Sequence, residues 1–102
     1  MINGTWEVNY KGNYELYVYE YGIKNRIMTV MNPSEGNYCL ESVEMGMYEG
    51  NEDDYFANGR MELDSTTPKM AMREAEDIME KWLKDRISYY ENCLNKRFGK
   101  TD

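Results

Sequence analysis

The residues best suited to chemistry lie in a stretch where carboxylates alternate with aromatic side chains. Between Ile27 and Gly59 the sequence has no lysine or arginine but seven acidic residues, so this segment carries a net charge of −7, equal to that of the whole chain. Charge gathered in this way attracts basic surfaces and repels nucleic acid, whose binding needs a positive patch. The segment therefore indicates electrostatic recognition of a basic protein surface, and direct binding of nucleic acid is not expected.

Two interpretations of this acidic segment remain open. In the first, it imitates the phosphate charge of nucleic acid and occupies a basic, nucleic-acid-binding groove of another protein, an effector for example. In the second, it is a solvated loop that keeps an acidic protein in solution. Under the first interpretation carboxylates speed the encounter, and the aromatic rings between them anchor the contact. The predicted partner-binding residues are Glu44, Tyr48, Glu49, Glu52, Asp53, Asp54, Tyr55 and Phe56.

Metal binding and catalysis are the other chemistries that carboxylates could serve. Residues 49–54 offer the oxygen ligands that calcium takes, but their order does not match an EF-hand loop, and we predict no metal site. The sequence has no histidine, which removes the commonest general base and the best ligand for transition metals. It also has no glycine-rich phosphate loop and no nucleophile elbow. We therefore expect a non-catalytic protein without a cofactor.

Composition sets the class of protein. The chain has 102 residues, of which 41% are hydrophobic and 30% are charged. These values predict one globular domain over residues 1–102. The chain has no apolar run long enough to cross a membrane, and its start does not resemble a secretory signal. Cys39 and Cys93 are interpreted as half-buried free thiols in a reducing compartment, with one long-range disulfide as the alternative. The expected location is the cytoplasm.

The pattern of apolar residues predicts an α+β fold. Residues 1–65 should form an antiparallel sheet of four to five strands arranged as a meander, because no connection is long enough for a parallel crossover. Residues 66–98 should form one long C-terminal helix packed on one face of this sheet. The expected strands span residues 5–10, 14–21, 26–31, 38–45 and 60–64, with a loop over most of 46–59.

Three tyrosines share one face of the second expected strand, namely Tyr17, Tyr19 and Tyr21. A three-residue loop at positions 11–13 would turn this tyrosine ladder away from the face of Trp6. A two-residue loop at positions 12–13 would reverse the two faces. The ladder could therefore be an outward protein-binding surface or part of the core.

The helix has clear boundaries and more length than the sheet can cover. Thr67 is the expected N-cap, Pro68 the first helical residue and Gly99 the stop signal. Such a helix spans roughly 45 Å, whereas a strand of seven or eight residues covers only about 25 Å. Either the helix breaks near residues 86–88, or its apolar end packs on a second copy or another protein. The residues that would form this self-association surface are Tyr89, Tyr90, Leu94 and Phe98.

In size, acidity and tyrosine content the chain is similar in kind to small phage- or plasmid-encoded inhibitors of bacterial defence, such as anti-CRISPR proteins and anti-restriction mimics of DNA. The similarity is one of type and involves no aligned residues. It implies an inhibitor that blocks a basic, nucleic-acid-binding surface of another protein. The alternative function is a homo-oligomeric structural or assembly subunit, such as a homodimer, that uses the end of the helix as its interface.

Overall fold

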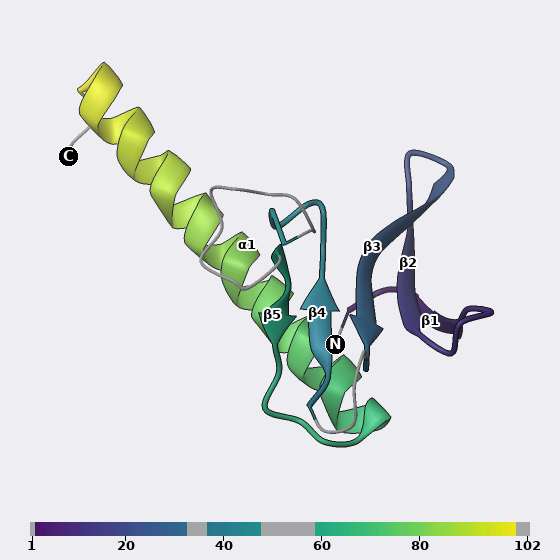
Figure 1. Ribbon diagram of the computed structural model, residues 1–102. Helices are drawn as coiled ribbons and strands as arrows, with labels where there is room; N and C mark the ends of the chain where they lie inside the picture. Colours follow the sequence, from purple (N-terminus) through teal and green to yellow (C-terminus); the bar gives the residue numbers. More distant parts are fainter. Residues whose placement is uncertain (1, 33–36, 48–58, 100–102) are drawn as a thin grey trace.

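The computed structural model describes residues 2–32, 37–47 and 59–99 and contains a meander of strands followed by one helix (Figure 1). All five strands pair antiparallel with their sequence neighbours, in the order β1-β2-β3-β4-β5. This confirms the predicted α+β class, with its antiparallel sheet and long C-terminal helix. The elements are β1 (Thr5–Val8), β2 (Tyr14–Glu20), β3 (Ile23–Met31), β4 (Cys39–Glu41), β5 (Met61–Glu62) and α1 (Pro68–Phe98).

Several strand boundaries differ from those predicted, each for a local reason. β3 begins at Ile23, earlier than the predicted residue 26, because the turn before it contains only Tyr21 and Gly22, with φ of 54° and 74°. Two residues of positive φ make the tight turn that suits the twist of a hairpin. β4 ends at Glu41, although residues 38–45 were predicted, because Ser42 and Met47 exchange backbone hydrogen bonds of 2.7 and 2.8 Å across a turn.

The hairpin of β1 and β2 settles which face carries the tyrosines. β1 ends at Val8 because the Asn9 side chain accepts hydrogen bonds from the backbone of Lys11 and Asn13, at 2.9 and 3.0 Å. Trp6 then pairs with Leu16, whereas a three-residue loop would pair it with Val18. A shift of two residues keeps each side chain on the same face of the sheet. The tyrosine ladder therefore lies on the face away from Trp6 and the helix, as the three-residue loop would have placed it.

The core lies between the sheet and the first half of α1. Leucine, methionine and valine side chains from the sheet meet two alanines and a methionine of the helix. Because alanine has no side-chain atom beyond Cβ, the helix axis lies close to the sheet. Burial of each larger aliphatic side chain contributes about 1.5–3 kcal/mol. The core includes Leu16, Met28, Val30, Leu40, Leu63, Ala71, Ala75 and Met79.

Two glutamates of α1 fasten the helix to the rest of the domain. The carboxylate of Glu76 accepts hydrogen bonds from Trp6 Nε1 at 2.9 Å and from the Ile2 amide at 3.3 Å. Glu74 accepts from the Asp64 amide at 3.1 Å, the Ser65 amide at 3.0 Å and Ser65 Oγ at 2.6 Å. Burial works to raise the pKa of Glu74, but these three hydrogen bonds outweigh it and lower the pKa.

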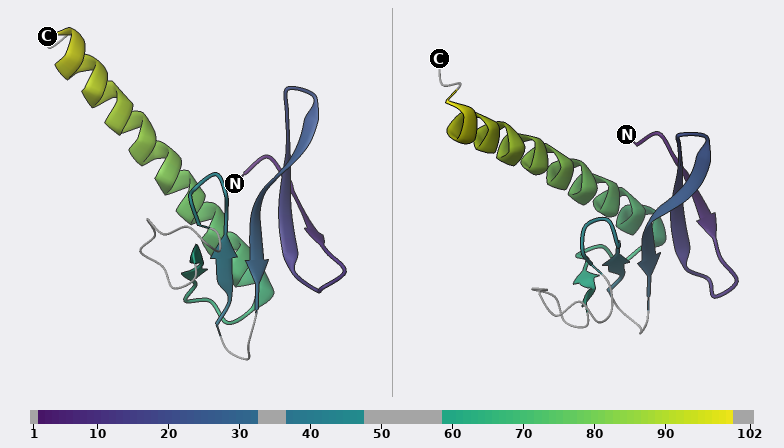
Figure 2. Two further views of the ribbon diagram at one scale, coloured as in Figure 1. Left: turned by 45° about the horizontal axis from the view of Figure 1, so that its top comes forward. Right: turned by 90° about the horizontal axis from the view of Figure 1, so that it is seen from above.

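The ends of α1 match the sequence prediction. Thr67 is the N-cap, and its hydroxyl accepts from the Met70 amide at 3.4 Å. Gly99 ends the helix in the left-handed conformation, with φ of 65°. Figures 1 and 2 show that the C-terminal half of α1 projects beyond the sheet as a free arm. The radius of gyration is 15.9 Å. A compact domain of about 100 residues would have a radius of roughly 13 Å, so the arm lengthens the molecule.

Candidate protein-binding surface

The outer half of α1 exposes large apolar side chains. Ala71, Ala75, Met79, Leu83 and Ile87 follow one another at intervals of four residues and so form a single ridge of the helix. Along this ridge the exposed fraction rises from 2% at Met79 to 43% at Leu83 and 57% at Ile87. The apolar face that packs on the sheet therefore continues into solvent once the sheet has ended.

Four of these exposed residues have the spacing of a coiled-coil interface. Leu83, Ile87, Tyr90 and Leu94 are separated by four, three and four residues, which keeps them on one side of a helix. We refer to these four residues as the helical seam. Phe98, 71% exposed, follows four residues after Leu94. Exposed apolar patches are typical of surfaces that bind proteins, membranes or ligands.

Of the two alternatives for the overhanging end, a break near residues 86–88 is wrong, because α1 is one continuous helix from Pro68 to Phe98. The sequence after Pro68 contains no further proline and no glycine before Gly99, so nothing interrupts the helical hydrogen bonds. Two ion pairs with a spacing of four residues support the exposed part: Lys81 with Asp85, and Lys84 with Glu80, both at 2.8 Å. Pairs at this spacing stabilise exposed helices.

The four residues predicted for self-association all lie on this exposed arm. More than half of each of Tyr89, Tyr90, Leu94 and Phe98 is exposed. The rings of Tyr89 and Tyr90 meet edge to face, with centroids 5.3 Å apart. Leu83 and Ile87 were missed, because the apolar pattern assigned them to the sheet-packing face. Helix length shows that part of α1 must project beyond the sheet, but the point where coverage ends, between Met79 and Leu83, comes from the structure.

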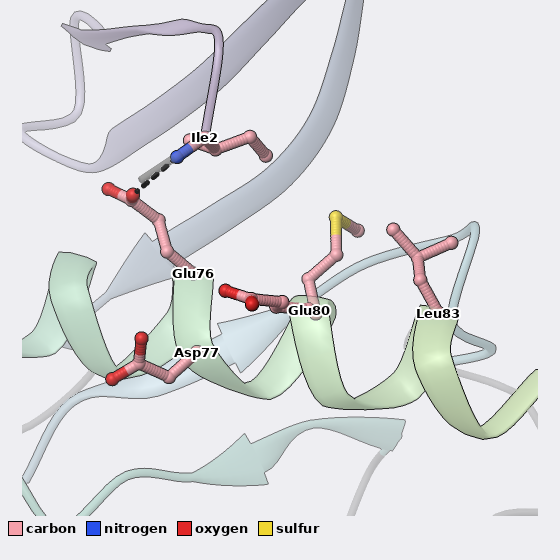
Figure 3. Close-up of a pocket in the computed structure, with 6 residues that line it drawn as sticks. Ile2, Glu76, Asp77, Glu80 and Leu83 are labelled. Carbon is pink, nitrogen blue, oxygen red and sulfur yellow. Dashed lines mark hydrogen bonds between the residues drawn. The ribbon is translucent and has the colours of Figure 1, made fainter.

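A hollow of about 240 Å³ lies where α1 leaves the sheet. In Figure 3, Glu76 and Leu83 project toward the side of the helix on which Ile2 lies, and the Ile2 amide donates to Glu76. The lining combines three apolar side chains with three carboxylates. This combination suits an apolar group that has positive charge nearby. The lining residues are Ile2, Glu76, Asp77, Met79, Glu80 and Leu83.

Two carboxylates at this hollow accept hydrogen bonds, one from within the helix and one from the N-terminal segment. Lys84 donates to Glu80 at 2.8 Å, which lowers the pKa of the Glu80 carboxyl and raises the pKa of the Lys84 ammonium. Glu76 is partly buried beneath Ile2. The hollow therefore combines an apolar floor with a rim of three carboxylates, of which Glu80 is paired with Lys84.

The predicted acidic partner-binding surface falls mostly outside the described residues. This applies to Tyr48, Glu49, Glu52, Asp53, Asp54, Tyr55 and Phe56. Glu44 is described and lies in the turn after β4. Glu41, from the same acidic segment, forms an ion pair of 3.1 Å with Arg60, so part of the segment's charge is neutralised.

The face of the sheet opposite α1 is polar and carries the tyrosine ladder outward. Tyr17 is half-buried beneath the Lys24 ammonium, 4.5 Å from its ring centroid, whereas Tyr19 and Tyr21 are exposed. Glu15 is buried and forms a 2.6 Å ion pair with Arg26. On this face the charges are paired across strands, whereas on the helical arm the apolar groups have nothing to cover them in the described structure.

Cys39 and Cys93 are half-buried free thiols, as expected, and burial raises the pKa of Cys39. Within residues 2–32, 37–47 and 59–99, no three potential ligand side chains gather as a metal site would require. Among the described helices none has the length and apolarity needed to cross a bilayer.

Comparison of the chain with models of protein families, with curated proteins and with solved structures finds no match.

Proposed function

We propose that this protein is a non-catalytic, self-associating subunit that uses the outer half of α1 as its interface. The observation that carries this proposal is the unbroken helical arm with four apolar side chains at coiled-coil spacing, all of them open to solvent. Most helical stability in proteins comes from packing of an apolar face, so packing of this face against a partner would stabilise the arm.

The hydrophobic effect supplies the driving force for this association. Removing apolar surface from water contributes about 25 cal/mol per Å². The exposed leucine, isoleucine and aromatic side chains of the arm offer such surface. Tyrosine and phenylalanine rings also bury large areas at little cost in side-chain entropy. The seam is thus built of the residue types that dominate the energetics of interfaces.

Light scattering over a range of protein concentrations tests this function. We expect the wild-type mass to rise from that of one chain towards that of two as concentration increases. Ile87→Ser should shift this transition to at least tenfold higher concentration. Ile23→Ser is the matched control, because Ile23 is a similarly exposed isoleucine (61%, against 57% for Ile87) on β3, remote from the seam. A wild-type mass of one chain at every concentration would falsify the proposal.

A second candidate function rests on the charge of the segment between Ile27 and Gly59, which lacks any lysine or arginine. In this proposal the acidic segment covers a basic, nucleic-acid-binding surface of another protein, as anti-CRISPR proteins and other phage inhibitors do. Glu44 and the acidic and aromatic residues that follow it would make the contact. The two functions are compatible, because the acidic segment and the outer part of α1 are different parts of the chain.

The acidic candidate is tested by exchanging Glu49, Glu52, Asp53 and Asp54 for serine. Capture of partners at low salt from cells that naturally contain the protein should lose its main bound protein with this variant, while circular dichroism stays unchanged. Binding should also weaken as salt is added, because exposed charges are screened. A partner held equally well by the serine variant would eliminate the acidic surface as the contact.

A further inference from the structure

The helical seam extends beyond its four residues in both directions. Towards the N-terminus it reaches Met79, which forms part of the floor of the hollow beneath Ile2. Towards the C-terminus it reaches Phe98, a large ring that is 71% exposed. The steps from Met79 to Ile87 are four and four residues, and the steps from Phe98 back to Tyr90 are also four and four. The seam therefore has the same spacing when read from either end.

We propose that a second copy of the chain lies antiparallel along the seam and places its Phe98 in the hollow beside Ile2. The proposal rests on the self-association proposed above and specifies its geometry. A two-fold axis passes between Ile87 and Tyr90, and each copy fills the hollow of the other. The facing pairs are Leu83 with the second copy's Leu94 and Ile87 with its Tyr90. The second copy's Phe98 then comes level with Met79, which is 2% exposed and forms the floor of the hollow.

Charge distribution along α1 favours this direction. The hollow is rimmed by Glu76, Asp77 and Glu80, whereas the last turn of the helix carries Lys96 and Arg97. An antiparallel pair brings Arg97 of each copy level with Glu80 of the other, twice per dimer, where it joins Lys84, the existing partner of Glu80. Lys96 is two residues from Leu94 and lies on the opposite side of the helix. The dipoles of the two helices also oppose each other, which is the favourable arrangement. A phenylalanine next to an arginine matches the apolar floor and the carboxylates of the hollow.

A parallel pair would lose these advantages. It would place the two copies of Arg97 side by side, and like charges at short range repel. It would also put both sheets at the same end of the helical pair, where they compete for the same space. The second copy is therefore the occupant that fits the hollow, and antiparallel is the orientation that fits the charges.

Disulfide trapping between two single-cysteine variants tests the orientation directly. Both native thiols are removed in the full-length chain by Cys39→Ser and Cys93→Ser. One preparation then carries Leu83→Cys, and a second, size-tagged preparation carries Leu94→Cys. A disulfide needs Cα atoms within about 7 Å. In the antiparallel register the two copies of position 94 lie about 16 Å apart along the axis, from the helical rise of about 1.5 Å per residue.

The expected result is a mixed disulfide between position 83 of one copy and position 94 of the other, with little 83–83 or 94–94 product. Abundant 83–83 and 94–94 products with little mixed product would overturn the antiparallel geometry and leave self-association standing. A protein that stays monomeric in light scattering would remove both proposals together.

Two charged substitutions of Phe98 test whether residue 98 lies next to the carboxylates of the second copy's hollow. Phe98→Lys should weaken the dimer less than Phe98→Glu, by at least threefold in dissociation constant at low salt, because the glutamate would face the acidic rim of the hollow. The reverse order would place residue 98 beside Lys96 and Arg97 of the second copy, as in a parallel pair, and would overturn the proposal. Added salt should reduce the difference between the two variants.

Discussion

Where α1 packs on the sheet it buries two alanines, Ala71 and Ala75, and then Met79, whereas from Leu83 to Phe98 it turns large apolar side chains toward solvent. Both parts lie on one continuous helix. Ala71 and Ala75 are completely buried, because the sheet approaches the helix backbone closely there. Leucine, isoleucine and aromatic side chains in the outer half would suit a wider gap, such as the roughly 8–10 Å between the axes of two packed helices. The side chains of the outer half therefore fit the helix-to-helix contact that the proposed association requires.

The two halves also use their carboxylates differently. In the packed half, Glu74 and Glu76 accept hydrogen bonds from groups outside the helix, on the N-terminal segment and on the chain between β5 and α1. In the outer half, Glu80 pairs with Lys84 of the same helix. The first half is therefore held in place by tertiary contacts, and the second by interactions that any exposed helix can make.

The largest expected effect on stability comes from truncating ridge side chains to alanine, one before and one after the point where the sheet ends. Met79→Ala should lower the free energy of unfolding by about 2–5 kcal/mol, because it leaves a cavity in the core. Ile87→Ala should change it by less than about 0.5 kcal/mol in dilute monomer, as surface substitutions do. Urea unfolding of both variants at low concentration provides the comparison. Similar losses for the two would mean that the outer half is packed on the domain itself.

A smaller effect is expected from Glu74→Gln, which keeps the shape of the side chain but removes its charge. Hydrogen bonds to a charged group contribute more than neutral ones, so we expect a loss of about 1–2 kcal/mol at pH 7. Folding lowers the pKa of Glu74 below its ordinary value of 4.5. Its contribution is therefore present above that pH and is lost as pH falls through the folded value, so the difference between wild type and variant should shrink below about pH 4 in urea unfolding. A constant difference from pH 7 to pH 3 would contradict this assignment.

The first and last residues of α1 were predictable because capping residues mark them. The ends of the strands depend on backbone turns that the residue types do not reveal. Thr67, Pro68 and Gly99 each act within a few residues of their own position. The start of β3 was missed because Tyr21 adopts a φ of 54°. Tyrosine has no preference for this left-handed conformation. The turn was therefore expected at the residues after Gly22, and the first part of β3 was assigned to it.

The candidate surface was only partly predictable for a related reason. The apolar pattern of α1 gives the direction of each side chain but not the point where the sheet stops covering it. β4 and β5 contain three and two residues, fewer than predicted, so the sheet covers less of the helix than expected. The sequence identified Tyr90, Leu94 and Phe98 because they lie far along the helix. Neither the predicted sheet nor the narrower observed sheet would cover them. For Leu83 and Ile87, which lie nearer the sheet, the width of the sheet determines whether they are covered.

The smallest expected effect concerns Glu80, the counterpart of Glu74 in the outer half. Its pKa is also lowered, but the cause is a hydrogen bond from exposed Lys84, whose charge water and salt screen. Glu80→Gln should leave urea unfolding of the dilute monomer unchanged within error, at low salt and at high salt alike. In a dimer, however, the same carboxylate would face the second copy's basic last turn, so Glu80→Gln should weaken association in light scattering at low salt. A loss of monomer stability comparable to that of Glu74→Gln would show that Glu80 makes tertiary contacts, and the distinction between the two halves would then fail.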